Sequence, residues 1–173
     1  MKKISNKAQF SINTNVELYG FDAKFVPTFE EYKKLKEKDE LKKHIIYEQH
    51  GSNLVVNQGL NFIRDVMIAS TTGSITHTQP GTSSTAVAAS DTALGGAIGS
   101  RLAAADRYSG GTGIINIDTF YTAGDNNGSW AEVGAFTASS GGSMIARKIL
   151  SSTFTKATTN TALLAWTFTM TSS

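Results

Sequence analysis

The residues of this 173-residue chain that are able to do chemistry are few and widely spaced. Its three histidines, His44, His50 and His77, match no metal-binding spacing, and the chain contains no cysteine. Metal ligation needs several imidazoles, carboxylates or thiolates that converge on one point. The sequence therefore predicts no metal site, no disulfide and no cofactor.

Two motifs for phosphate binding and nucleophilic catalysis are incomplete. Gly95, Gly96 and Gly99 have the spacing of a phosphate-binding loop, but no Gly-Lys-Ser/Thr follows them. Ser100 is followed by Arg101, and the closing glycine of a nucleophile elbow is missing. We expect this stretch to be a closely packed or flexible loop.

Three carboxylates in the second half of the chain are candidates for acid–base chemistry. Asp118, Asp125 and Glu132 would form a catalytic set if a hairpin brought them together. A turn explains Asp125 equally well, and a structural hydrogen bond or ion pair explains Glu132. The chain is not expected to be an enzyme.

Charge is concentrated in the first part of the chain. Residues 1–50 carry ten of the 16 Lys and Arg residues and eight of the 14 Asp and Glu residues, and residues 51–173 carry six of each kind. The second part is therefore neutral overall, and a neutral surface rich in Ser and Thr does not attract nucleic acids. Such a surface favours assembly with copies of the same chain.

No segment is predicted to enter a membrane. No apolar run approaches the ~20 residues that cross a bilayer. Lys2 and Lys3 are not followed by the apolar stretch of a signal peptide. We expect a protein that is made in the cytoplasm without a recognisable export signal.

The second half of the chain has the pattern of an antiparallel β-sandwich. Short apolar runs, separated by turns rich in Gly, Asn and Ser, predict strands at 74–79, 113–122, 129–137, 143–150 and 162–171. The turn at 125–128 is predicted to close a hairpin. In the last strand Leu164, Trp166, Phe168 and Met170 share one face, which we assign to the core.

One amphipathic helix is predicted to pack on this sandwich, at 57–69. Leu60, Ile63, Val66 and Met67 recur at helical spacing and form its apolar stripe. Asn57 is the predicted N-cap.

The charged residues 1–50 are predicted to form a separate, partly helical arm or flap beside a sandwich domain at 51–173. Alternating residues from Phe10 to Leu18 indicate a short strand, and 29–43 a helix capped by Thr28. This helix is either a solvated cover over one edge of the domain or a basic surface that docks on a neighbouring subunit.

Six short motifs follow one another along residues 51–173. They are N-L-V-V-N-x-G-L, a Gly-Thr pair, D-T-x-L-G with a later arginine, E-V-G-x-F, an Ala-Arg pair and a closing strand with a central tryptophan, at 53–60, 81–82, 91–95 with Arg101, 132–136, 146–147 and 164–170. In this order they resemble a family of small tailed-bacteriophage virion proteins of the tail, baseplate or tail-fibre-base kind. Ala97 departs from the family, which often has an acidic residue there.

The resemblance implies a structural component of a virion that assembles as a ring or trimer with copies of itself and with neighbouring virion proteins. A capsid-decorating or head-fibre-anchoring protein is an alternative, since its β-sandwich would have the same sequence pattern. A carbohydrate-binding β-sandwich is a third possibility. It would use exposed aromatic residues such as Tyr108, Tyr121 or Trp130, although Trp130 lies in phase with core positions.

The long loop before the main strands is the predicted subunit contact, because long loops in compact domains usually carry a function or an interface. Arg101 is expected to hold the loop at 80–99 in shape through Asp91 or Glu132; a partly exposed surface arginine is the alternative. The candidate contact residues are Asp91, Thr92, Leu94, Gly95, Arg101 and Glu132.

Overall fold

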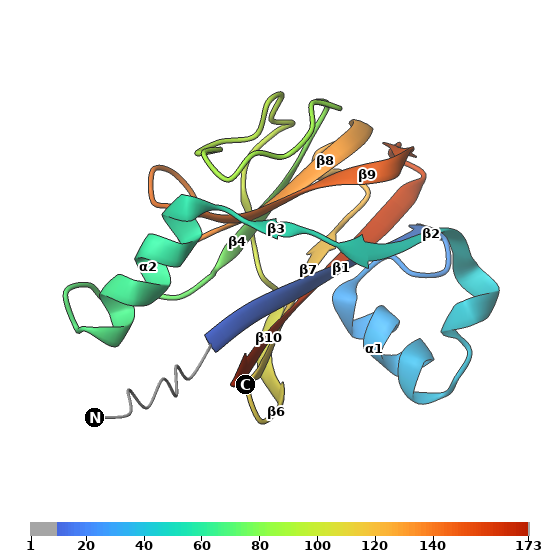
Figure 1. Cartoon of the computed structure of the whole chain (residues 1–173). Helices are drawn as coiled ribbons and strands as arrows, with labels where there is room; N and C mark the ends of the chain where they lie inside the picture. Colours follow the sequence, from blue (N-terminus) through green and yellow to red (C-terminus); the bar gives the residue numbers. More distant parts are fainter. Residues whose placement is uncertain (1–9, 173) are drawn as a thin grey trace, which may run out of the picture.

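A computed structural model describes residues 10–172 of the chain. Residues 1–9 and 173 lie outside the described part, and with them Lys2, Lys3 and the beginning of the predicted arm. Two five-stranded antiparallel sheets pack face to face (Figure 1). This confirms the predicted mainly β, antiparallel sandwich.

The strands divide between the sheets without regard to their order in the sequence. Sheet I has the order β2-β1-β10-β7-β6 and sheet II the order β3-β9-β8-β4-β5. Sheet I contains β1 (Phe10–Asp22), β2 (Ile45–Ser52), β6 (Asp106–Gly111), β7 (Ile114–Tyr121) and β10 (Asn160–Ser172). Sheet II contains β3 (Leu54–Val55), β4 (His77–Gly81), β5 (Leu102–Ala103), β8 (Gly128–Phe136) and β9 (Met144–Lys156). The helices are α1 (Phe29–Glu37), the short 3-10 helix η1 (Leu41–His44) and α2 (Asn57–Met67).

The predicted boundary between an arm at 1–50 and a sandwich at 51–173 is wrong. Strand β1 pairs along its 13 residues with β10 and lies between β10 and β2 in sheet I. Its Val16 and Leu18 are buried in the main core. Within residues 10–50, the segment that stands outside the sheets is 23–44.

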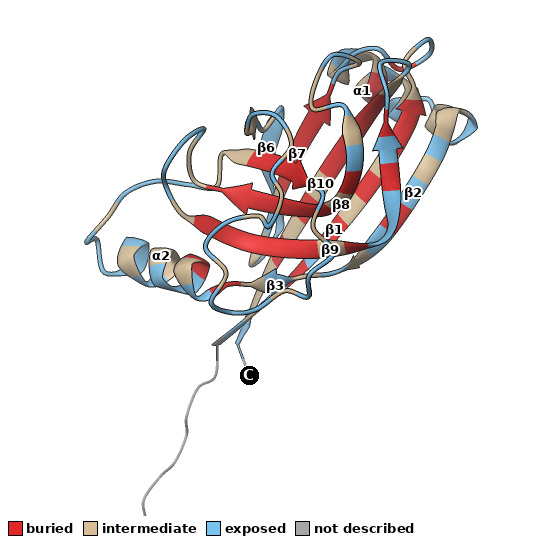
Figure 2. Ribbon diagram, turned by 90° about the horizontal axis from the view of Figure 1, so that it is seen from above, coloured by how far each residue is buried: buried red, intermediate tan, exposed pale blue. Residues whose placement is uncertain are grey.

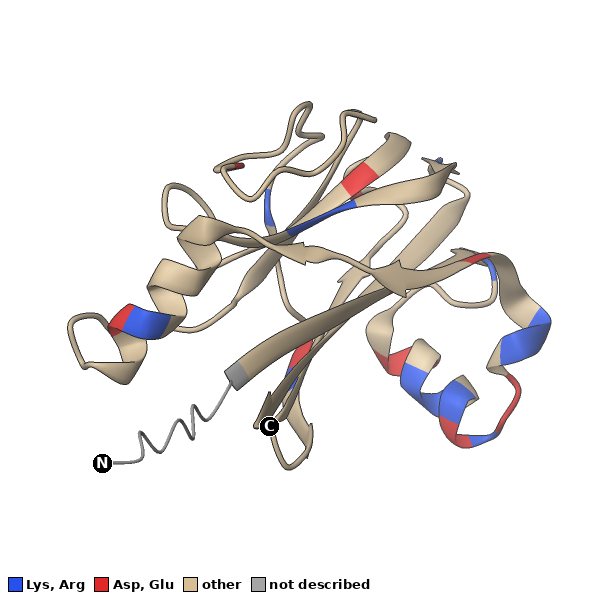
Figure 3. Ribbon diagram, in the orientation of Figure 1, with Lys and Arg blue, Asp and Glu red and all other residues tan. Residues whose placement is uncertain are grey.

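That charged segment folds back over the outer face of sheet I. The Thr28 hydroxyl caps α1 by accepting from the backbone N–H of Glu31 at 3.2 Å, as predicted. Phe29, Tyr32 and Leu35 pack on a second apolar cluster that sheet I supplies through residues such as Phe120. Figure 3 shows Lys, Asp and Glu concentrated along α1 and η1, and none of the lysines and glutamates of these two helices is buried. Of the two interpretations of this helix, the structure therefore favours a cover over the domain's own sheet.

Helix α2 is fixed to the sandwich by its first turn. A Cβ atom at Gly59 would lie 2.2 Å from the backbone oxygen of Ile145, so the helix approaches β9 as closely as glycine allows. Val56, not Asn57, occupies the N-cap position. Phe62 also packs against the main core. The end of the helix stands away from the sheets (Figure 2), and Leu60, Val66 and Met67 are 47%, 39% and 73% exposed. The predicted packing of the whole stripe is therefore only partly right.

The turn at 125–128 forms, but it does not close a hairpin. It joins β7 in sheet I to β8 in sheet II. The Asp125 carboxylate accepts hydrogen bonds from the backbone N–H and the hydroxyl of Thr122, both at 2.7 Å. Asn126 takes the positive φ of 45° that this tight crossing requires. The hairpin prediction was wrong because the two strands beside the turn belong to different sheets, and the local sequence does not specify the sheet that a strand joins.

The main core confirms the face assigned to the last strand. Leu164, Trp166 and Phe168 are buried in it, and Met170 is half-buried. The Trp166 ring stacks on Phe168 with a centroid distance of 6.0 Å.

Replacing Trp166 by alanine should therefore lower the free energy of unfolding by about 3–5 kcal/mol, the usual loss for a buried aromatic side chain. Chemical denaturation measures it. Phe25→Ala is the matched control, since Phe25 is 46% exposed and outside the core. Equal stabilities of the two variants would refute the core assignment.

Candidate functional site

A buried ion cluster lies on the outer face of sheet II, under the long loop that joins β4 to β5. Glu132 on β8 and Arg147 on β9 are 0% and 3% exposed. Arg147 Nε donates to Glu132 Oε2 at 2.7 Å, and its Nη1 donates to Asp91 Oδ2 at 2.6 Å. The third nitrogen, Nη2, donates to the backbone oxygen of Thr85 at 3.2 Å. One guanidinium thus holds two strands and two points of the loop.

Glu132 fixes both limbs of the same loop. Its carboxylate accepts from the backbone N–H groups of Ser83 and Gly95, each at 3.2 Å, and of Gly96 at 2.8 Å. A Cβ atom at Gly81 would lie 2.5 Å from Glu132 Oε1, so a side chain there would displace the carboxylate. The loop is therefore held by its backbone, and its outward side chains are free to vary.

The end of the loop nearest β5 is held from the turn between the sheets. Asn126 Nδ2 donates to the backbone oxygens of Ile98 at 3.0 Å and Ser100 at 2.8 Å. Gln79 Nε2 donates to the backbone oxygen of Gly99 at 2.7 Å. Beneath the loop, Val87 and Leu94 pack on a small apolar cluster of Val56, Phe136 and Met144. Although the loop has little regular structure, hydrogen bonds and apolar contacts hold it at many points between β4 and β5.

The electrostatics of the cluster favour its charged form. The backbone N–H of Ala88 and the guanidinium of Arg147 hold the pKa of Asp91 below its ordinary value. Burial alone would lower the pKa of Arg147, but its hydrogen bonds with Asp91 and Glu132 raise it. A buried ion pair contributes more to geometry than to net stability, because desolvation offsets the attraction. We therefore infer that the main effect of the ion cluster is to fix the conformation of the loop between β4 and β5.

Three of the candidate contact residues, Asp91, Gly95 and Glu132, meet in this cluster, but the arginine that joins them is Arg147 and not Arg101. Arg101 has no carboxylate partner. It donates to the backbone oxygens of Ala138 and Gly141, and its guanidinium lies 3.8 Å from the centroid of the Phe136 ring. It therefore supports the β8–β9 turn.

The role predicted for Arg101 belongs to Arg147, which sequence reasoning missed although it stands in the Ala-Arg motif. Of the other candidate contact residues, Thr92 is exposed and Leu94 is half-buried under the loop. Contact of this loop with another subunit stays a prediction.

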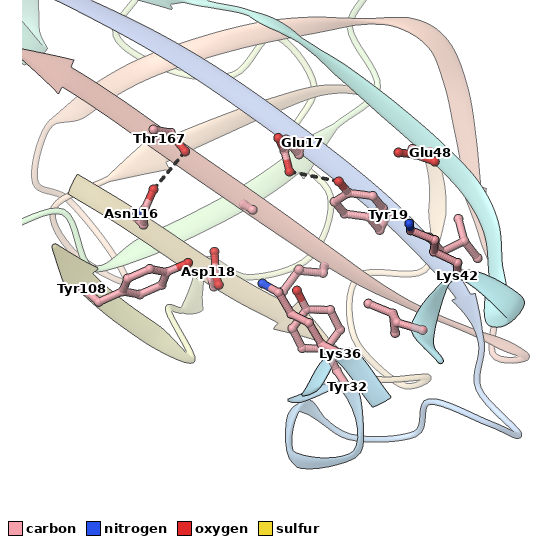
Figure 4. Close-up of a pocket in the computed structure, with 14 residues that line it drawn as sticks. Glu17, Tyr19, Tyr32, Lys36, Lys42, Glu48, Tyr108, Asn116, Asp118 and Thr167 are labelled. Carbon is pink, nitrogen blue, oxygen red and sulfur yellow. Dashed lines mark hydrogen bonds between the residues drawn. The ribbon is translucent and has the colours of Figure 1, made fainter. Parts of the chain in front are cut away.

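A second site lies on the opposite side of the sandwich, on the outer face of sheet I. It is a polar cavity of about 640 Å³ between α1, η1 and the strands (Figure 4). Its lining residues are Glu17, Tyr19, Tyr32, Lys36, Leu41, Lys42, Ile45, Glu48, Tyr108, Asn116, Asp118, Leu163, Ala165 and Thr167. The charged segment that was predicted to be an arm forms one wall of this cavity.

Asp118 is the most buried carboxylate of this cavity, with 6% of the residue exposed. Burial raises the pKa of Asp118, and Asp106 adds to this effect, whereas Lys36 and a hydrogen bond from Tyr108 oppose it. Glu17 accepts from the Tyr19 hydroxyl at 3.0 Å, and Asn116 accepts from the Thr167 hydroxyl at 3.0 Å. In Figure 4 the Asp118 carboxylate lies between Tyr108 and Lys36.

The carboxylate set considered from the sequence does not form. Asp118 lines the cavity on sheet I, Glu132 lies in the ion cluster on sheet II, and Asp125 belongs to the turn. The aromatic candidates also separate, because Tyr121 and Trp130 are completely buried. Tyr108 is 43% exposed and lines the cavity.

Within residues 10–172, no group of three or more histidine or acidic side chains is placed to hold a metal ion. In the same part of the chain, no helix has the length and apolar character needed to cross a membrane.

Replacing Arg147 by methionine should destabilise the protein by about 3–5 kcal/mol, because Glu132 would be left buried without its counter-ion. The loop at 82–101 should also become sensitive to elastase, which cleaves after small residues. Arg64→Met is the matched control. The Arg64–Asp65 pair is exposed on α2, so its loss should cost less than about 1 kcal/mol. If elastase does not cleave the loop in the Arg147 variant, Arg147 does not hold the loop in place.

Comparisons of the chain with protein-family models, with curated proteins and with solved structures gave no match. The relation to tailed-phage virion proteins is therefore a resemblance that six sequence motifs carry.

Proposed function

We propose that the protein is a structural component of a tailed-phage virion, of the tail, baseplate or fibre-attachment kind. It acts by binding further copies of itself, in a ring or trimer, and neighbouring virion proteins. The virion assignment rests on the sequence motifs, and the assignment to self-assembly rests on the surface of the molecule.

The observation that carries self-assembly is the apolar surface at α2, which no other part of residues 10–172 covers. A groove of about 520 Å³ separates this helix from the open end of the sandwich. Its walls are almost entirely apolar and include Ile63, Val66 and Met67 of α2, with Ile115 and Met170 of sheet I. Met67, which lines the groove, is 73% exposed, and the next residue, Ile68, is 65% exposed. Apolar surface of this extent is typical of a protein-binding face.

The charge of the surrounding surface favours a second copy as the occupant. Residues 51–173 carry six basic and six acidic side chains, and Figure 3 shows charge gathered at the distant α1 and η1. An interface between identical chains brings similar surfaces together, so like charges there would repel. The α2 surface carries few charges: Arg107 lines the groove, and Arg64 and Asp65 on α2 pair with each other. The pinned loop supplies a rigid second contact, with small residues facing outward.

Changing Met67 or Ile68 to glutamate should weaken self-association at least about 100-fold, because a carboxylate buried in an apolar contact without a partner costs several kcal/mol. Mass photometry and sedimentation over a range of concentrations measure the association. Thermal stability should stay near that of the wild type, since both side chains are largely exposed.

Ile46→Glu provides the control, because Ile46 is 53% exposed on β2, away from α2. It should leave assembly intact. A wild-type protein that stays monomeric at the highest soluble concentration would refute self-assembly. Loss of assembly in the Ile46 variant alone would show that the contact between copies lies at β2 and not at α2.

A further inference from the structure

The polar cavity over sheet I has an arrangement that the packing of the sandwich does not require. Glu17, Ala165 and Asp118 stand directly opposite one another on three neighbouring strands. The outer two positions are therefore about 10 Å apart, with the small Ala165 between them. The alanine leaves the floor open, and the two carboxylates flank it.

Asp118 is only 6% exposed, and a hydrogen bond from Tyr108 acts against the rise of its pKa that burial causes. An ionised carboxylate has about four acceptor positions, so a single donor leaves most of them free. Its carboxylate faces the cavity between Tyr108 and Lys36 (Figure 4). A ligand with a hydroxyl or N–H group in this cavity would donate to the remaining acceptor positions.

The charges of the lining exclude a strongly charged ligand. Three carboxylates (Glu17, Glu48 and Asp118) and two ammonium groups (Lys36 and Lys42) line the cavity. A polycation would meet the ammonium groups, and a phosphate would meet the carboxylates. A neutral ligand rich in hydroxyl groups suits the mixture, because each hydroxyl both donates and accepts.

The remaining features of the cavity fit a sugar ring. Its volume of about 640 Å³ is within the range of small-ligand sites, roughly 300–1,000 Å³. The Tyr108 ring, 43% exposed, stands at one side and offers a flat face to the apolar C–H groups of a pyranose. Acceptors and donors surround the space that such a ring would fill.

We propose that this cavity binds a neutral saccharide unit, with the pyranose ring against Tyr108 and its hydroxyl groups hydrogen-bonded to Asp118, Glu17 and Asn116. The site shares no residue with the groove assigned to self-assembly. The saccharide site and the self-assembly proposal can therefore be tested independently.

Saturation-transfer NMR on the full chain tests this site with D-glucose, D-galactose, N-acetyl-D-glucosamine and L-rhamnose as probes at millimolar concentration. At least one sugar should bind. For that sugar, Tyr108→Ala and Asp118→Asn should each raise the dissociation constant about tenfold or more, the contribution expected of a contact with a charged or aromatic group. Circular dichroism checks that both variants remain folded.

Two matched variants lie outside the cavity. Phe25→Ala removes an aromatic ring as exposed as Tyr108, and Asp65→Asn removes a carboxylate on α2. Both should bind the sugar as the wild type does. The saccharide site is overturned if none of the four sugars binds, or if the cavity variants bind as tightly as the controls.

Binding of spermidine or inorganic phosphate in the cavity, without any sugar, would also overturn the proposal and identify an ion site. Met67→Glu, which targets assembly, should retain sugar binding. Its result separates failure of this site from failure of the proposed function.

Discussion

The antiparallel pairing of β1 with β10 is the constraint on which the rest of the structure depends. It joins the two ends of the described chain along 13 residues and places β1 in the interior of sheet I. The inward side chains of these strands build the main core. Outward, Glu17 on β1 and Ala165 on β10 form the floor of the polar cavity. At the open end, Ile12 and Met170 line the apolar groove beside α2.

On sheet II, a few polar side chains fix the loop between β4 and β5, where a large apolar contact would be the more common arrangement. The loop between β4 and β5 has many small residues and buries little apolar surface. Arg147 and Glu132 fix it instead by contacts with its backbone and with Asp91. Because these bonds do not depend on the outward side chains, the loop can present a constant shape with a variable surface. Such a loop suits a role in assembly.

The sequence predicted the features that a few neighbouring residues determine, such as a helix cap or the buried face of a strand. The wrong predictions concern contacts between residues that are distant in the sequence. The Thr28 cap and the buried face of Trp166 follow from a few neighbouring residues. The pairing of β1 with β10 does not, because the alternation at 10–18 predicts a strand but does not specify a partner at the other end of the chain. Arg147 and Arg101 look alike in sequence; the register of β8 and β9 decides which reaches Glu132. The polar cavity has no local motif, since its lining comes from five strands and two helices.

The central claim is that copies of this chain meet through the apolar surface of α2. The most direct test is electron cryo-microscopy of the assembled wild-type protein. We predict that a neighbouring copy covers Met67 and Ile68 and fills the groove between α2 and sheet I. Particles in which α2 and this groove face solvent in every subunit would contradict the claim.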